Sequence, residues 1–297
     1  MSLNQVLEKY FTADEMVKVK EKMIFDEGGN ELNIGDIKFT LSDDRLILKD
    51  FPSKFGYEVP GTDEEFRTWE GIAFIKVRII NTAEDIISRA RTGDLYDESY
   101  YTARGGGGPY TKYPLRSDGV SEEDRFKDLA VELLKKYGKI KILDSGCATG
   151  FLVKPLQDLG LDAYGFDISE FAINNGICRN LFLADGRKLP FKDNEFDLLI
   201  SQDYMEHIHP DDLSAVLKEQ KRVLKKNGIA LHFIPFYKDF KSPVQIDAHL
   251  CTANRSWWKN ILEQTNILTL EFMPDEEDQW DYTHGLLSQY IVLRNPE

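Results

Sequence analysis

The feature that most constrains the fold is the segment from Lys139 to Gly150, which reads KIKILDSGCATG. A short apolar run ends at Asp144, and Gly146 and Gly150 follow within a few residues. This order predicts a buried strand, a tight glycine turn and the start of a helix. The glycines let the backbone approach a ligand where a Cβ atom would collide, and a helix start offers unpaired N–H groups. The segment therefore predicts a site for a nucleotide-like cofactor.

The acid before the loop narrows the choice of cofactor. A dinucleotide fingerprint reads G-x-G-x-x-G, and its middle glycine makes room for a pyrophosphate. Here Ala148 takes the middle position, and the carboxylate of Asp144 would repel a pyrophosphate but suits the ammonium of an amino acid. The pattern D-x-G-x-x-x-G resembles motif I of the class I S-adenosylmethionine (SAM) methyltransferases. Cys147, inside the loop, is expected to be a small packing residue and not a nucleophile.

Two more predicted strands end in acids. Asp167 ends a strand over 161–167, and an acid at that place suits the two ribose hydroxyls of an adenosine. Asp185 follows a strand over 181–184, and the resemblance implies that it accepts a hydrogen bond from the adenine amino group. A single acid at a strand end is usually a turn former or a helix cap. Three acids at successive strand ends, with a glycine loop after the first, favour cofactor binding.

The family's remaining features follow in order. A fourth strand is predicted over 196–202, a charged helix over 213–224, a turn over 226–228 and a fifth strand over 229–234. The resemblance covers residues 140–234 and is to the broad type 11 group of methyltransferases. It implies a SAM site formed by ten residues of the glycine loop and the strand tips. These are Asp144, Gly146, Cys147, Ala148, Gly150, Asp167, Ile168, Asp185, Gly186 and Gln202.

Composition sets outer limits on the function. The net charge of −14 disfavours binding to a nucleic-acid backbone, which needs clustered Lys and Arg. The basic residues within 218–226 are expected to form a solvated helix face. No apolar run approaches the length of a membrane span, and the N-terminus lacks a basic and then apolar signal. The three cysteines are widely spaced, which fits a reducing cytoplasm.

Residues 1–98 carry no recognised motif and are expected to form a small α+β extension of unknown role. Helical spacing of apolar residues predicts helices over 3–11 and 12–23. It also favours a helix over 62–80, where the alternation of Ile75, Val77 and Ile79 leaves a strand as the alternative. Alternating residues on both sides of a polar turn predict a hairpin over 37–48.

A glycine-rich loop is expected over 99–120, ahead of motif I. It contains four consecutive glycines together with aromatic and basic residues, among them Tyr101, Arg104 and Tyr113. Similar segments in some type 11 methyltransferases fold over the cofactor, so the resemblance implies a lid that excludes water. The alternative is a flexible linker between two domains.

The acceptor side is expected after the fourth strand, in the sequence QDYMEHIHP. His207 is the candidate general base, because its unperturbed pKa lies nearest neutrality, with Glu206 beside it. Asp203, Glu206 and His207 also resemble the E-x-x-E-H metal motif of ubiquinone-pathway and small-RNA O-methyltransferases. His249 would be a fourth ligand for Mg²⁺, in a site acting on a catechol or an RNA ribose hydroxyl. Asp203 replaces the first Glu, and Mg²⁺ prefers oxygen ligands, so a metal-free site is expected.

These features predict an α/β domain over 99–297. Its Rossmann-like sheet has seven mostly parallel strands, and a helix over 254–264 leads to strands over 267–272 and 287–293, the last one antiparallel. The resemblance predicts SAM-dependent methyl transfer to oxygen or nitrogen of a small molecule. The alternatives are a non-catalytic SAM-binding module and an NAD-type oxidoreductase. The sequence indicates no particular oligomeric state.

Overall fold

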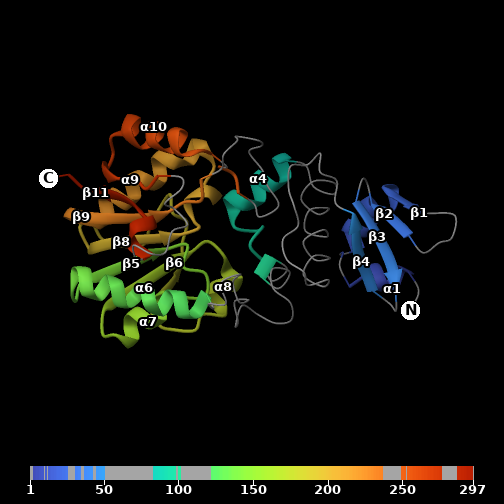
Figure 1. Cartoon of the computed structure of the whole chain (residues 1–297), viewed down its shortest axis with the longest axis horizontal. Helices are drawn as coiled ribbons and strands as arrows, with labels where there is room; N and C mark the ends of the chain where they lie inside the picture. Colours follow the sequence, from blue (N-terminus) through green and yellow to red (C-terminus); the bar gives the residue numbers. More distant parts are fainter. Residues whose placement is uncertain are drawn as a thin grey trace.

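The structure is a computed structural model of the 297-residue chain. Figure 1 shows a large α/β unit and a small N-terminal sheet, with the helix α4 (Ala83–Thr92) drawn between them. The structure describes residues 3–9, 11, 13–25, 31–34, 37–42, 45–50, 83–97, 100–101, 122–236, 249–251, 253–275 and 286–296.

The large unit is built on a seven-stranded sheet with the order β10-β11-β9-β8-β5-β6-β7. The five strands from β9 to β7 pair in parallel, whereas β11 is antiparallel to β9 and β10 is antiparallel to β11. This confirms the predicted fold class. The strands are β5 (Lys141–Ser145), β6 (Asp162–Asp167), β7 (Leu181–Leu183), β8 (Phe196–Gln202), β9 (Leu224–Phe233), β10 (Thr269–Phe272) and β11 (Ile291–Arg294).

Helices cover both faces of this sheet, which explains why its central strands are almost continuously apolar. On one face, α6 and α7 pack in a core with strand residues such as Ile142 and Ile200. On the other face, α9 and α10 pack in a second core around the fully buried Trp258. The helices are α6 (Glu122–Tyr137), α7 (Val153–Asp158), α8 (Glu170–Asn174), α9 (Leu213–Val223) and α10 (Arg255–Thr265).

The N-terminal sheet has its own core. Four antiparallel strands pair in the order β1-β2-β3-β4 and bury Leu32, Ile34 and Phe39 against side chains of two short helices. The predicted hairpin over 37–48 is confirmed as β3 and β4. The predicted helix over 62–80 lies outside the described residues. The elements are α1 (Leu3–Leu7), α2 (Ala13–Glu21), β1 (Met23–Phe25), β2 (Glu31–Ile34), β3 (Ile37–Ser42) and β4 (Arg45–Asp50).

Three element boundaries differ from the sequence predictions. Met23 begins a strand and does not extend the second helix, because residues 23–25 pair with 32–34. The predicted turn over 226–228 lies within β9, where a register shift against β8 accommodates it and Asn227 has a φ of 61°. The segment 286–289 is a short 3₁₀ helix, so the last strand begins at Ile291.

The segment that contains α4 contacts the large unit. Ala90, Tyr96 and Tyr101 share a small apolar cluster with Ala172 of α8 and with Leu250. The predicted domain boundary at 98/99 therefore runs through residues that pack together. Among the described helices, none has the length and apolarity that a membrane crossing requires.

Candidate functional site

The candidate cofactor site lies where the parallel strands end. Asp144 is opposite Gly165 and Ile200 in the neighbouring strands, and Asp167 is opposite Leu183. Because parallel strands all run in one direction, the predicted residues at their carboxyl ends gather along one edge of the sheet. Ligands of open α/β sheets bind at this edge.

The glycine loop after β5 has the geometry that the sequence predicts. Gly146 has a φ of +73°, and a Cβ atom there would lie 2.5 Å from Cδ2 of Tyr204. Gly150 has a φ of +97°, and its Cβ would lie 2.7 Å from Sγ of Cys178. Ala148 also takes the left-handed conformation, with a φ of 47°, which is strained for a residue with a Cβ. The loop therefore requires its glycines, and it requires an interaction that stabilises the left-handed conformation of Ala148.

Asp167 provides that stabilising interaction. Its Oδ2 accepts a hydrogen bond of 2.9 Å from the Ala148 N–H, and its Oδ1 accepts one of 2.8 Å from the Ser169 N–H. Burial raises the pKa of the Asp167 carboxyl group, and these N–H donors oppose that rise. The same side chain thus orders the glycine loop and keeps an acid at the ribose position that the sequence predicts.

Asp144 is the second buried acid of the site. Only 4% of this residue is exposed. Burial, together with the neighbouring charge of Asp167, raises the pKa of the Asp144 carboxyl group to about 8. Without a ligand this acid is therefore protonated at neutral pH, and a cationic ligand group would favour its ionised form. This is the behaviour expected of an acid that receives an ammonium group. Burial also raises the pKa of the adjacent Cys147 thiol, which fits a packing residue.

The loop after β7 carries Asp185 and Gly186. A Cβ atom on Gly186 would lie 2.0 Å from the hydroxyl of Tyr204, so the Tyr204 ring fills the space between this loop and Gly146. Asp185 accepts hydrogen bonds from Arg187 through both of its carboxylate oxygens. The sequence patterns did not predict a role for Arg187 in the site.

Buried polar atoms line this edge of the sheet. The hydroxyls of Ser145, Thr149 and Tyr204 are buried and have no hydrogen-bond partner within the part of the chain that the structure describes. Such groups are costly unless a ligand or water satisfies them. Together with two buried acids beside a glycine loop, they fit SAM, which carries an ammonium, two ribose hydroxyls and an adenine amine. The residues present therefore suit the cofactor that the resemblance implies.

Arg125 is a residue that the sequence analysis missed. It lies in the first turn of α6, is only 7% exposed, and donates a 3.2 Å hydrogen bond to Oε1 of the predicted site residue Gln202. The hydroxyl of Tyr290 donates to the same Oε1, at 2.5 Å. The guanidinium also lies over the ring of Phe233, 5.3 Å from its centre. A buried cation therefore lies at the end of β8, beside the strand that carries Asp144.

The predicted acceptor residues also come together. Glu206, His207 and His249 offer ligand atoms that all lie within 4.8 Å of one another. The two imidazole rings pack edge to face with their centres 4.6 Å apart, and Tyr96 packs against His207 at 5.9 Å. Glu206 and His207 belong to a 3₁₀ helix, Met205–His207, and the Cys251 N–H donates to the Glu206 carbonyl. Asp203 is exposed, accepts from Gln202, and is not in this group.

The predicted lid lies mostly outside the described residues, among them Arg104, Tyr113 and the four glycines. Its first residues can be placed. Tyr101 stacks on Phe171 of α8 with ring centres 5.6 Å apart. The Ser169 hydroxyl donates a 2.5 Å hydrogen bond to the Tyr96 carbonyl, and Ile168 shares their apolar cluster. Tyr96, ahead of the predicted lid, is therefore joined to Ser169, two residues after Asp167.

The buried acid makes a prediction for the ligand-free protein. The Asp144 pKa is raised from 3.8 to about 8 in the folded state, so the folded protein holds this proton more tightly than the unfolded chain does. The free energy of unfolding should therefore fall as the pH rises from about 4 to about 8, by up to about 1.4 kcal/mol per pH unit from this group. Chemical denaturation of the wild type and of Asp144→Asn at several pH values tests this. The Asn variant should show a flatter pH dependence, and an unchanged slope would contradict the assignment.

Comparisons with known proteins find a match that includes the strands and loops of this site. Residues 143–232 match the model of the type 11 family, described as a methyltransferase domain. Over 117 residues the chain is 32% identical to a ubiquinone biosynthesis O-methyltransferase of Pelagibacter ubique, covering 36% of this chain and 48% of that protein. Over 192 residues it is 25% identical to the Bartonella bacilliformis protein of the same name, covering 54% and 74%.

Among solved structures, a putative methyltransferase from Bacillus halodurans aligns with a TM-score of 0.44 and 16% identity, covering 58% of this chain and 99% of that one. The chain spans about half the length of the Pelagibacter ubique relative. Residues 143–232 thus match the type 11 methyltransferase domain family, and the sheet has the order expected of the class I fold, whose cofactor is S-adenosylmethionine.

Proposed function

We propose that the chain is a SAM-dependent methyltransferase that acts on an oxygen or nitrogen atom of a small molecule. The observation that carries this proposal is the grouping of Asp144, Asp167 and Asp185 along one sheet edge, around a glycine loop with buried hydroxyls. Each acid has a matching cationic or hydrogen-bond-donating group on SAM. The alternatives, a non-catalytic SAM-binding module and an NAD-type oxidoreductase, gain no comparable support from the described residues.

The amino-acid end of SAM is recognised by two opposite charges. Asp144 receives the ammonium group, because its buried carboxyl becomes ionised when a cation is beside it. Arg125 receives the carboxylate, since a guanidinium pairs with carboxylates in a fixed planar geometry. Its hydrogen bond to Gln202 places the guanidinium at the end of β8. The ribose hydroxyls donate to Asp167, and the adenine amine donates to Asp185 beside Gly186.

The chemistry is methyl transfer in a site that excludes water. When bound, SAM supplies a methyl group on a sulfonium; the acceptor atom bonds to the methyl carbon while the carbon–sulfur bond breaks and the sulfur keeps the electron pair. The protein holds the two partners in line. His207 takes the acceptor proton as general base, and Glu206 and His249 orient its ring. The names of the two ubiquinone biosynthesis relatives favour oxygen as the methylated atom.

A second candidate function is metal-assisted O-methyl transfer, and the grouping of Glu206, His207 and His249 favours it. Two ligands about 2.1 Å from one ion lie at most about 4.2 Å apart, so a spread of 4.8 Å needs only small side-chain movements. Two imidazoles and one carboxylate suit a transition ion such as Zn²⁺, Mn²⁺ or Fe²⁺ better than Mg²⁺. When bound, the ion would lower the pKa of an acceptor hydroxyl.

The first test of the proposal is cofactor binding. Calorimetry should show that SAM and its demethylated product, S-adenosylhomocysteine, bind to the folded protein. Asp167→Ala should weaken binding by roughly 1–3 kcal/mol, because charge-assisted hydrogen bonds to the ribose are lost. Asp167 also holds the glycine loop, so Asp167→Asn, which keeps one acceptor oxygen, serves as the milder variant. No binding by a folded wild-type protein would overturn the proposal.

A second test concerns Arg125. Arg125→Ala should weaken binding of S-adenosylhomocysteine about 10-fold or more, since a charge-assisted hydrogen bond contributes roughly 1.5–3 kcal/mol. Binding of 5′-methylthioadenosine, which lacks the amino-acid end, should change little. The matched control is Arg255→Ala. Arg255 is a partly buried arginine at the start of α10, and it donates two hydrogen bonds to backbone carbonyls. Equal losses for both ligands would mean that Arg125 only supports the fold.

A third test separates the two candidates on the acceptor side. Metal assistance predicts that EDTA removes activity, that Mn²⁺ or Zn²⁺ restores it, and that His249→Ala is about as harmful as His207→Ala. A metal-free base predicts activity that is insensitive to EDTA and a roughly 10²–10⁴-fold loss in His207→Ala, partly recovered at high pH. His209→Ala is the control, because this histidine caps the next 3₁₀ helix, Pro210–Asp212, and is not in the group.

A further inference from the structure

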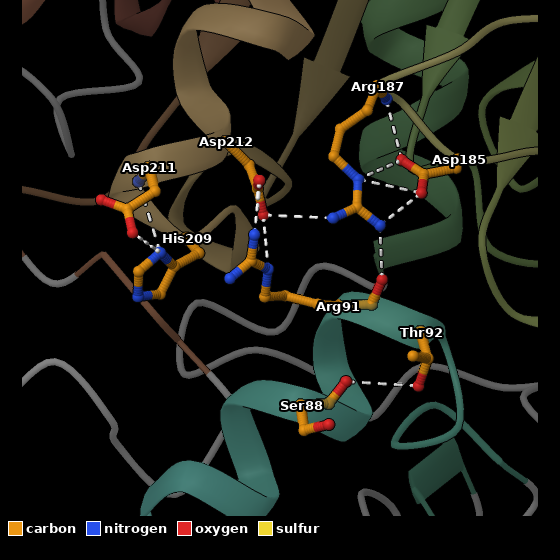
Figure 2. A network of polar contacts seen from close by, with 8 residues as sticks. All are labelled: Ser88, Arg91, Thr92, Asp185, Arg187, His209, Asp211 and Asp212. Atoms are coloured by element: carbon orange, nitrogen blue, oxygen red, sulfur yellow. Dashed lines mark hydrogen bonds and ion pairs between the residues drawn. The ribbon is translucent and has the colours of Figure 1, made fainter.

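The orientation of Asp185 is set by one neighbouring arginine. Nε of Arg187 lies 3.0 Å from Oδ1 and 2.9 Å from Oδ2, and Nη2 lies 2.5 Å from Oδ2. The Arg187 backbone N–H also donates to Oδ1, at 2.8 Å. This is a side-on, two-point pair, which fixes the plane of the carboxylate as well as its position. Figure 2 shows the two side chains facing each other.

Arg187 is in turn held by the last turn of α4. Its Nη2 donates a 2.7 Å hydrogen bond to the carbonyl oxygen of Arg91, and its Nη1 lies 3.3 Å from Oδ2 of Asp212. The Arg91 side chain pairs with the same Asp212, with Nε 2.8 Å from Oδ2 and Nη2 2.8 Å from Oδ1. Figure 2 shows this chain of contacts running from Asp185 through Arg187 and Asp212 to α4.

The network is balanced in charge and partly shielded from water. Two acids and two arginines alternate, and the shared carboxylate of Asp212 is only 14% exposed. The two links to α4 join residues far apart in sequence: Arg91 and Asp212 are 121 positions apart, and Arg187 and Arg91 are 96 apart. Because several charges form one network, its geometry is better defined than that of an isolated surface pair.

The same geometry leaves Asp185 able to accept another donor. Three N–H groups of Arg187 point at the carboxylate: the backbone N–H at Oδ1, Nη2 at Oδ2, and Nε, whose single hydrogen is shared between the two oxygens. A carboxylate has about four lone-pair sites, so these three hydrogens leave one site for a further donor; among the described residues, no other group donates to the Asp185 carboxylate. Asp185 therefore presents one acceptor site of fixed direction at the cofactor edge of the sheet.

We propose that Arg187 is a positioning residue for adenine recognition, and that α4 makes residues 83–92 of the N-terminal region part of the cofactor site by holding Arg187. This inference rests on the proposed function. Arg187 fixes the plane of the Asp185 carboxylate so that its remaining acceptor site accepts from the exocyclic amine of the adenine. A deaminated base carries a carbonyl oxygen at that place and would set one acceptor against another. A site built to hydrogen-bond one group rejects an analogue that lacks it.

The experiment compares two ligands that differ only at this amine. Calorimetry measures the affinity of each protein for S-adenosylhomocysteine and for S-inosylhomocysteine, the deaminated analogue. The wild type should prefer the adenosyl ligand. Arg187→Ala should reduce this preference about 10-fold, because Asp185 is then free to turn, while the affinity for the inosyl ligand stays within about twofold. Arg187→Lys keeps the charge but not the two-point geometry, and it should lose most of the same preference.

Two matched controls separate positioning from stability. Arg222 forms a similar network with Glu219 and Asp193, so Arg222→Ala should leave the preference unchanged. Arg91→Ala should lower the preference about 2- to 5-fold, since Arg91 reaches Asp185 only through Asp212 and Arg187. Arg89→Ala, on the same helix and paired with Asp97, should not lower it.

The outcomes separate this inference from the proposed function. A folded wild type that binds neither ligand would overturn the proposed function itself. A wild type that binds S-adenosylhomocysteine, together with an Arg187→Ala variant that loses affinity for both ligands equally, would overturn only the role of Arg187. Asp185→Asn provides the last check, since its side-chain amide can donate to the inosyl carbonyl. It should shift the preference towards the inosyl ligand, and an unchanged preference would show that Asp185 does not read the base.

Discussion

The arrangement of the site depends on one buried carboxylate, that of Asp167. It accepts the N–H of Ala148 in the glycine loop and the N–H of Ser169 at the start of α8. The first bond stabilises a left-handed alanine that would otherwise be strained. The second fixes Ser169, whose hydroxyl caps α8 and donates to the carbonyl of Tyr96. One side chain therefore joins two strand ends and the segment after α4.

The site gathers three acids in a small space, and the protein accommodates each one differently. Burial and the neighbouring charge of Asp167 raise the pKa of Asp144, so this acid is protonated until a cation arrives. Asp167 has backbone N–H donors, which favour its ionised form against the cost of burial. Asp185 forms an ion pair with Arg187. These differences match the three groups of the proposed ligand: a cation for Asp144, hydroxyls for Asp167 and a neutral amine for Asp185.

The sequence alone predicts the parts of the candidate site that follow from local pattern. A strand that ends in an acid is visible in sequence, and the parallel order then brings such ends together, as Asp144 and Asp167 show. The sequence patterns did not indicate Arg125 or Arg187, because their roles depend on contacts with residues that are distant in sequence. Arg125, for example, donates a hydrogen bond to Gln202, which is 77 positions away. The turn at Asn227 was visible in sequence, but its inclusion in β9 depends on pairing with β8. Likewise, Met23 has helical spacing, and only its pairing with Ile34 makes it part of a strand.

The two halves of the site differ in how firmly the fold fixes them. The cofactor half consists of strand ends, whose positions are set by the sheet's hydrogen bonds. The acceptor half consists of a short 3₁₀ helix and the segment of His249, joined by the hydrogen bond from Cys251 to the Glu206 carbonyl. A site on loops is adjusted by local changes that leave the sheet intact. The cofactor half can therefore be inferred from the fold, whereas the acceptor depends on which group Glu206, His207 and His249 hold between them: a proton in transfer, or a metal ion.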